Sequence, residues 1–200
     1  MHDKHQEFFD TLAVEWDLMF TAEDFERLQH IVEGLGVKPG MDILDLGCGT
    51  GILFDILRRV VGEQGSVTGV DFSFKMAEKA HRNFPFANVN VVDTDATDLP
   101  FADSSFDMAV AFSAFPHFSN QRRAVDEIHR VVKNGASCYV IHLESSREIN
   151  KVHQRIGGAV EHDEIPPEGA LREMFDSSKF ENVNIVDHPG LFLLSAVSSK

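Results

Sequence analysis

A glycine-rich run carries the clearest chemical signal in this sequence. Asp45 is followed at short intervals by Gly47, Cys48, Gly49 and Gly51. Glycine permits backbone conformations with positive φ, and it lets main-chain amides approach a ligand without an intervening side chain. The spacing is Gly-x-Gly-x-Gly, whereas dinucleotide-binding proteins use Gly-x-Gly-x-x-Gly. We interpret the run as a ligand-binding turn.

Acidic residues follow the next two predicted strands. Asp71 lies about 20 residues beyond Gly51 and ends a predicted strand, where a carboxylate can accept hydrogen bonds from both ribose hydroxyls. Asp95 and Ala96 belong to a second acidic loop, after the third predicted strand. Because the carboxyl ends of parallel strands share one edge of a sheet, three consecutive strands end in residues suited to one nucleoside ligand.

The elements that must position these residues alternate between helical and extended patterns. Helices are predicted over residues 6–20, 22–33, 52–61, 74–84, 121–132, 147–156 and 166–176, and strands over 41–46, 65–70, 89–92, 106–112 and 137–143. A terminal hairpin is predicted from 183–187 and 191–197, joined by Pro189-Gly190. This alternation predicts an α/β fold, with a mostly parallel sheet and helices on both faces.

Composition narrows the class of protein. The 200 residues, 43% hydrophobic, suit one domain with a single core. The net charge of −14 disfavours nucleic acid as a partner, since such a surface repels phosphates. We find no apolar run long enough for a membrane span and no signal-peptide pattern, and the two cysteines are far apart, so we expect a cytoplasmic protein.

Several motifs together resemble those of the class I S-adenosylmethionine-dependent methyltransferases. Residues 42–51 look like motif I of that family and residues 70–76 like motif II. Residues 95–101 and 105–107 are similar to its adenine loop and the start of its fourth strand. Residues 130–135 resemble its R-x-L-K-P-G turn, with Asn134 replacing proline. The resemblance extends from about Phe8 to Val197 and includes the ubiquinone/menaquinone C-methyltransferase type.

The resemblance implies a single Rossmann-like domain, S-adenosylmethionine as cofactor and S-adenosylhomocysteine as product. It also implies a seven-stranded sheet. Within the domain, we expect N-terminal lid helices over residues 1–35, a cofactor-binding core over 36–144, and substrate-side helices and the terminal hairpin over 145–200. The aromatic residues of the first helix, such as Trp16, would cover the cofactor.

The resemblance also implies roles for individual residues. The three glycines would line the methionine part of the cofactor, with Asp45 orienting the loop and the ammonium group. Asp71 would hold the ribose, and Phe112 and Ser113 would border the sulfonium. Met76 would pack on the adenine, and Asp95 with the Ala96 amide would read its edge. The expected cofactor-binding set is Asp45, Gly47, Cys48, Gly49, Gly51, Asp71, Phe72, Met76, Asp95, Ala96 and Phe112.

Histidines mark the expected acceptor side. His117 follows the fourth predicted strand, and His142 ends the fifth, so both are candidate catalytic residues. Asn150 and His153 share one helix face, and Glu144 lies two residues after His142. We leave open whether this group binds the acceptor or a metal, and we assign no metal ligand. His162-Asp163-Glu164 lies nearby in the following loop.

The favoured function is methyl transfer to a small-molecule acceptor by in-line displacement, which needs alignment more than a named base. Two alternatives stay open at this point: a non-catalytic module that binds the cofactor or its product, and a methyltransferase acting on a protein or a nucleic acid. A homodimer is possible, because the short chain lacks an inserted cap over the substrate.

Overall fold

The computed structural model describes residues 2–200, with side chains described from Lys4 onward. Met1, which begins the expected lid segment, lies outside the described residues. The strands are β1 (Asp42–Leu46), β2 (Ser66–Asp71), β3 (Val89–Asp93), β4 (Phe106–Phe112), β5 (Val132–His142), β6 (Phe180–His188) and β7 (Leu191–Ser198). The α-helices are α1 (His2–Leu12), α2 (Ala22–Gly34), α3 (Phe54–Val61), α4 (Phe74–Asn83), α5 (Gln121–Val131), α6 (Ser146–Ile156) and α7 (Glu168–Ser177). Three short 3₁₀ helices are η1 (Trp16–Met19), η2 (Phe115–His117) and η3 (Gly158–Val160).

In residues 2–200 these strands form one seven-stranded sheet in the order β3-β2-β1-β4-β5-β7-β6. Strands β1 to β5 pair in parallel, whereas β7 runs antiparallel to both β5 and β6. The expected mostly parallel sheet with a terminal antiparallel hairpin is therefore confirmed. Strand order reverses between β1 and β4, and ligands of open α/β sheets bind outside the carboxyl ends of the strands at such a point.

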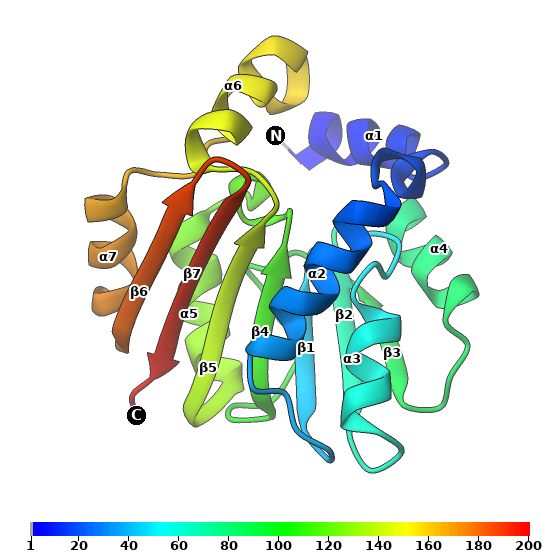
Figure 1. The fold of residues 1–200 in the computed structure, drawn as a ribbon, viewed down its shortest axis with the longest axis vertical. Coiled ribbons are helices and arrows are strands. Elements are labelled where there is room, and N and C mark those ends of the chain that lie inside the picture. The colour runs from blue at the N-terminus through cyan, green and yellow to red at the C-terminus, as the bar shows by residue number, and fades with distance from the viewer. Residues whose placement is uncertain (1) are drawn as a thin grey trace.

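Helices cover the sheet on both faces, as expected from the alternating pattern. One apolar cluster joins Leu28 of α2 and Leu57 of α3 to Ile43 of β1. A second cluster, on the other face, joins Ile128 of α5 and Phe175 of α7 to the sheet. Figure 1 shows α2 and α3 in front of the sheet and α5 and α7 behind it, while α1 and α6 lie above its upper edge. The helices α1 and α6 thus stand over the edge where β1 and β4 end.

The N-terminal segment differs from the single helix predicted over residues 6–20, which was wrong. Helix α1 ends at Leu12, and Trp16 begins the separate helix η1. The contacts of η1 explain the break. Asp17 accepts a hydrogen bond from Thr50 and pairs with Lys79 at 2.8 Å. These partners are far along the chain, so tertiary contacts override the local helical pattern.

Three other boundaries shift by a few residues. Helix α3 begins at Phe54 instead of residue 52, because the glycine loop continues as a turn in which the Phe54 amide donates to the carbonyl of Gly51 at 3.0 Å. Strand β5 begins at Val132 instead of 137, with Gly135 at a φ of 76° and an irregular register against β4. Strand β6 begins at Phe180, earlier than expected.

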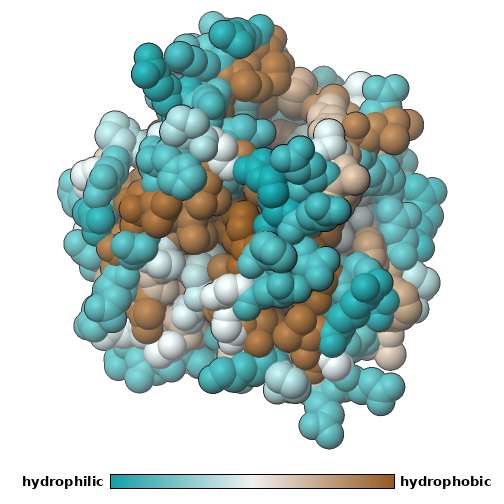
Figure 2. Space-filling view, viewed as in Figure 1, coloured by the Kyte–Doolittle hydropathy of each residue, from teal (hydrophilic) through white to brown (hydrophobic). Residues whose placement is uncertain are grey.

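The viewed surface is mixed in character. Figure 2 shows a hydrophilic outer face on α2, and hydrophobic surface to its left over the upper parts of β6 and β7. Leu191 and Leu193 of β7 are half-buried there. Among residues 2–200, no helix combines the length and apolar character needed to cross a bilayer.

Candidate cofactor and acceptor site

The glycine loop joins β1 to α3 and is closely packed. Gly47, Gly49 and Gly51 have φ angles of 66°, 54° and 90°, a region that glycine enters without steric cost. A Cβ added at Gly47 would lie 2.4 Å from the Cβ of Ala114, just beyond β4. Position 47, which lies where the strand order reverses, therefore has room for glycine alone.

Asp71 ends β2 and braces the loop. One of its carboxylate oxygens accepts a hydrogen bond from the amide of Gly49 and the other from the amide of Ser73, both at 2.8 Å. Its side chain is buried, and burial raises its pKa to about 6 against the lowering effect of those two bonds; the nearby carboxylate of Asp93 adds to the rise. The sequence-predicted ribose ligand thus lies beside the glycine loop.

Asp45 ends β1 in an unusual environment. It is 1% exposed, and neither carboxylate oxygen has a hydrogen-bond partner among the described residues. Burial, and then repulsion by Asp71, raises its pKa to about 8. A buried carboxylate without a partner is costly, and a cationic ligand group would offset that cost. This orphaned acid fits the ammonium group of the expected cofactor.

The residues expected around the adenine take two kinds of position. Met76 is buried against Phe9 of α1, and Phe72 packs edge-on to the same ring, with centroids 5.6 Å apart. Asp95 accepts hydrogen bonds from the Thr97 amide at 2.7 Å and from the Ser119 hydroxyl at 3.0 Å. Ser119 is a partner of Asp95 that the sequence analysis missed.

Two further members of the expected set are buried apolar groups. Ala96 is 6% exposed and belongs to the apolar cluster that includes Ile128 of α5. Cys48 is 5% exposed and belongs to the cluster that includes Leu28 of α2. Cys48 is a free thiol whose pKa burial raises well above its usual value, with the carboxylates of Asp71 and Asp45 adding to the effect. The thiol is therefore protonated and acts as a small packing group.

The N-terminal segment closes over this loop. Trp16 and Phe20 line a cavity of about 10 Å³ together with Asp45, Gly47, Cys48, Gly49, Ile52, Leu53, Phe112 and Ser113. That volume holds about one water molecule. The ring centroids of Phe20 and Phe112 are 5.7 Å apart, so aromatic contacts join the lid to the end of β4. This cavity is far smaller than a nucleoside.

Beyond η2, one carboxylate joins three elements. Asp163, in the loop after η3, contacts Nδ1 of His117 at 2.6 Å through one oxygen. The Nε2 atom of His5, on α1, lies 3.0 and 3.1 Å from the two oxygens of the same carboxylate. His153 of α6 contacts the backbone carbonyl of Asp163 at 2.6 Å. The sequence analysis named His117, His153 and Asp163 but not their connection, and it missed His5.

The remaining residues of the expected acceptor group differ in their burial and in their hydrogen bonds. His142 is 3% exposed, its Nε2 has no hydrogen-bond partner among the described residues, and burial lowers its pKa to about 3. Asn150 bonds both the amide and the carbonyl of Ile165, at 2.9 and 3.1 Å, so it holds the loop after α6. Glu144 is exposed. Among the described residues, no cluster of three or more histidine, cysteine or carboxylate side chains has a geometry that could hold a metal ion.

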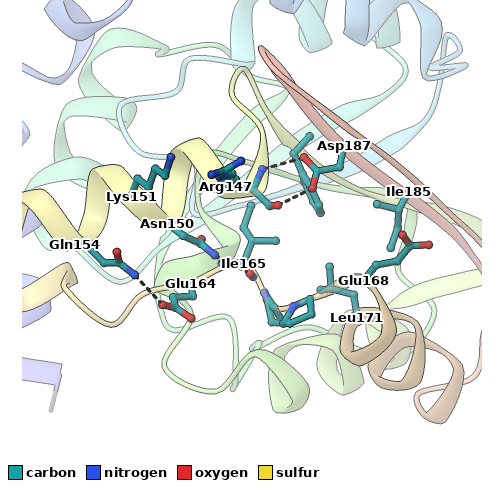
Figure 3. A pocket seen from close by; sticks show the side chains of 14 residues that line it. Arg147, Asn150, Lys151, Gln154, Glu164, Ile165, Glu168, Leu171, Ile185 and Asp187 are labelled. Carbon is teal, nitrogen blue, oxygen red and sulfur yellow. Dashed lines mark hydrogen bonds between the residues drawn. The ribbon is translucent and has the colours of Figure 1, made fainter.

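A second cavity, of about 400 Å³, lies on the far side of α6, between α6, α7 and β6. Figure 3 shows Asn150 and Gln154 pointing from α6 toward this cavity, with Leu171 and Ile185 on the opposite side. A hydrogen bond from Gln154 to Glu164 crosses its edge at 3.4 Å. This cavity is separate from the cavity at the glycine loop.

Comparisons with known proteins show which family the chain resembles. A family model described as a methyltransferase domain matches residues 44–140. A demethylmenaquinone methyltransferase of Desulfitobacterium hafniense is 37% identical over 138 residues, which cover 65% of this chain and 54% of that protein. The ubiquinone/menaquinone biosynthesis C-methyltransferase UbiE of Shewanella pealeana is 31% identical over 190 residues, covering 90% of this chain and 75% of that protein.

Solved structures match the fold over most of the chain. A SAM-dependent methyltransferase from Aquifex aeolicus has a TM-score of 0.68 at 21% identity, covering 90% of this chain and 99% of that one. A methyltransferase from Haloferax volcanii, solved with the Trm112 activator, has a TM-score of 0.79 at 20% identity, covering 96% and 98%. Against the curated relatives, by contrast, the match often spans little more than half of their length, from 54% to 65% in three of them.

Proposed function

Since the chain belongs to the class I S-adenosylmethionine-dependent methyltransferases, we propose that it transfers the methyl group of this cofactor to a small-molecule acceptor. One observation carries the proposal. Two buried carboxylates, Asp45 and Asp71, lie at the carboxyl ends of adjacent parallel strands, beside a loop in which a Cβ added at Gly47 or Gly51 would clash. One of them has no partner for its charge, and the other is already fixed toward the loop.

In this mechanism the chain's own residues bind and orient the cofactor. The bound cofactor supplies a methyl group on a sulfonium. The Asp45 carboxylate would hold the ammonium of its methionine part, and Asp71 would accept hydrogen bonds from the ribose. Phe112 and the lid residues Trp16 and Phe20 exclude water from the transfer site. Exclusion of water and alignment lower the barrier of an in-line displacement without requiring a metal.

The acceptor is proposed to be a small, ring-bearing molecule of the quinone class. Curated relatives named for demethylmenaquinone and 2-phytyl-1,4-naphtoquinone support this class. The net charge of −14 works against a nucleic-acid acceptor. The cytoplasmic location and the homodimer expected from the sequence stay predictions.

Isothermal titration with S-adenosylhomocysteine tests the cofactor site. We expect micromolar binding by the wild type and a loss of about tenfold or more in Asp71→Ala, since hydrogen bonds to a charged group are worth about 1.5–3 kcal/mol. Because burial raises the pKa of Asp71 to about 6, affinity should also fall as the pH drops below that value. Asp98→Ala, at an exposed loop position, is the matched control. A folded wild-type protein that binds no S-adenosylhomocysteine would contradict the proposal, whereas binding without turnover on any acceptor would favour a non-catalytic module.

A further inference from the structure

We propose that His117, held by Asp163, is the base that removes the proton from a hydroxyl group of an aromatic acceptor. This inference rests on the proposed methyl transfer and adds to it the acceptor class and a catalytic pair. It also assigns Asp163 as the positioning residue for His117.

His117 lies four residues after Ser113, in the short segment that follows β4. Ser113, which lines the cavity at the glycine loop, and His117 belong to one short segment after β4. The segment folds back on itself, since the amide of His117 donates to the carbonyl of Ala114 at 2.9 Å. Ser113 has a φ of 52°, a conformation that is uncommon for residues other than glycine and that clusters at functional sites.

The contact with Asp163 fixes which nitrogen of His117 is available. An ionised carboxylate only accepts hydrogen bonds, so Nδ1 of His117 carries the hydrogen in the 2.6 Å contact. The lone pair of the neutral ring is then on Nε2, and no hydrogen bond among the described residues engages that atom. The carboxylate also stabilises the imidazolium that forms when Nε2 accepts a proton.

The protonation states suit a base. Burial lowers the pKa of His117, although its bond to Asp163 opposes the shift, so the ring is neutral near pH 7. Burial alone would raise the pKa of Asp163, but the hydrogen bonds from His117 and His5 outweigh it and hold the pKa below its usual value. The titratable groups facing His117 are Asp163, His5 of α1, His153 of α6 and His142 at the end of β5.

The surroundings of His117 suit a flat, apolar acceptor. The ring of Phe9, on α1, lies edge-on to His117 with centroids 4.9 Å apart. The ring of His153 lies 4.7 Å from it on another side. Phe9 itself packs against Phe72 and Trp16. Aromatic neighbours beside the unengaged Nε2 of His117 favour a ring compound that carries an ionisable hydroxyl.

The reaction balances with these groups alone. The hydroxyl proton passes to Nε2 of His117, and the freed electron pair forms a bond from the acceptor's oxygen, or from a conjugated ring carbon, to the methyl carbon. The carbon–sulfur bond breaks with its electrons remaining on sulfur, so the sulfonium becomes a thioether. When a ring carbon is methylated, its own proton leaves to solvent and the hydroxyl recovers a proton from His117.

The test uses 2-naphthol, whose absorption reports its ionisation, with the full chain saturated with S-adenosylhomocysteine. We expect the bound naphthol to ionise at lower pH than free naphthol, by about one pH unit, which is a tenfold change in the ionisation constant. Asp163→Asn and His117→Gln should abolish this shift, and Asp163→Glu should restore part of it. His162→Gln, at an exposed position in the same loop, should leave it unchanged.

Nitrogen NMR of the imidazole rings supplies a second readout that needs no acceptor. The neutral form of His117 should carry its hydrogen on Nδ1 in the wild type, and Asp163→Asn should alter this tautomer while circular dichroism shows an intact fold. A naphthol shift that survives in both Asp163→Asn and His117→Gln would overturn the proposal. Bound S-adenosylhomocysteine without naphthol binding would overturn the acceptor class alone, whereas no binding of S-adenosylhomocysteine would defeat the underlying methyltransferase function.

Discussion

The indole of Trp16 lies directly against Gly49, such that a Cβ added to this glycine would be 3.3 Å from the Nε1 atom of the indole. Residues that the sequence assigns to a lid and to a cofactor loop are therefore in van der Waals contact. Asp17 secures the same contact through Thr50 and Lys79. Trp16 and Asp17 thus hold the N-terminal segment against the glycine loop in this structure.

Removing the indole should speed cofactor entry. In Trp16→Ala the closed state loses its main contact with the loop, so a larger fraction of molecules is open to ligand. We expect the association rate constant for S-adenosylhomocysteine to rise about tenfold, as it would if opening became easier by about 1.4 kcal/mol. Surface plasmon resonance measures it. Leu18→Ala, at a side chain that is 83% exposed in the same short helix, is the control. Equal association rates in wild type and Trp16→Ala would contradict a closed lid.

Substituting Gly47 should destabilise the fold by more than its backbone angle explains. Gly47 and Gly158 have similar φ angles of 66° and 63°, but a Cβ at Gly47 would lie 2.4 Å from Ala114, whereas one at Gly158 would contact nothing within 4 Å. Both alanine variants pay a conformational cost of about 1–2 kcal/mol. We expect Gly47→Ala to lose a further 1–3 kcal/mol or so from overpacking. Urea denaturation of the two variants measures the difference. Equal losses of unfolding free energy would show that the glycine loop shifts to accommodate the added methyl group.

The protein without ligand should lose stability as the pH rises toward 8. Burial raises the pKa of Asp45 to about 8, against about 3.9 in an unfolded chain. Between these values the folded chain binds the proton more tightly than the unfolded chain, so the free energy of unfolding falls with increasing pH. Asp71, with a pKa raised to about 6, contributes in the same direction below that pH.

Asp45→Asn isolates the larger contribution. It removes the buried charge, so we expect the free energy of unfolding at pH 8 to rise by about 1–3 kcal/mol. Its slope with pH between about 6.5 and 8 should also become flatter than in the wild type. Urea denaturation at several pH values measures both effects, with Asp98→Asn as the exposed control. Identical slopes for wild type and Asp45→Asn would show that the carboxylate stays ionised and has a partner in solution.

Arg130 should be the most costly cation to remove. Its guanidinium bonds both oxygens of the buried Glu127 at 3.0 and 2.8 Å, and the carbonyls of Leu99 and Phe101 at 2.8 and 2.7 Å. Arg130→Ala leaves the buried Glu127 carboxylate with only the Leu99 amide at 3.0 Å and Arg123 at 3.5 Å, so we expect a loss of about 2–4 kcal/mol in thermal or urea denaturation. Arg122→Ala, at an exposed position in the same helix, should change stability by less than about 0.5 kcal/mol.

The cofactor side could be predicted from sequence because its signals are local. The glycine spacing sits in one turn, and Asp45 and Asp71 are each the last or next-to-last residue of a strand whose apolar pattern is evident. The lid and the acceptor side depend instead on contacts between distant positions. Asp163 meets His117 across 46 residues, and Asp17 meets Thr50 across 33. No periodicity records such pairings, which is why the break before Trp16 and the role of Asp163 were missed.

The contact between His5 and Asp163 also bears on the order in which the molecule assembles. These partners are 158 residues apart, so a ribosome adding about 5–20 residues per second makes the lid helix roughly 8–30 seconds before its anchor. During that interval α1 can already pack Phe9 against Phe72, but His5 still lacks its partner. The contact between His5 and Asp163 is therefore expected to form after α1 has packed on the N-terminal half of the sheet.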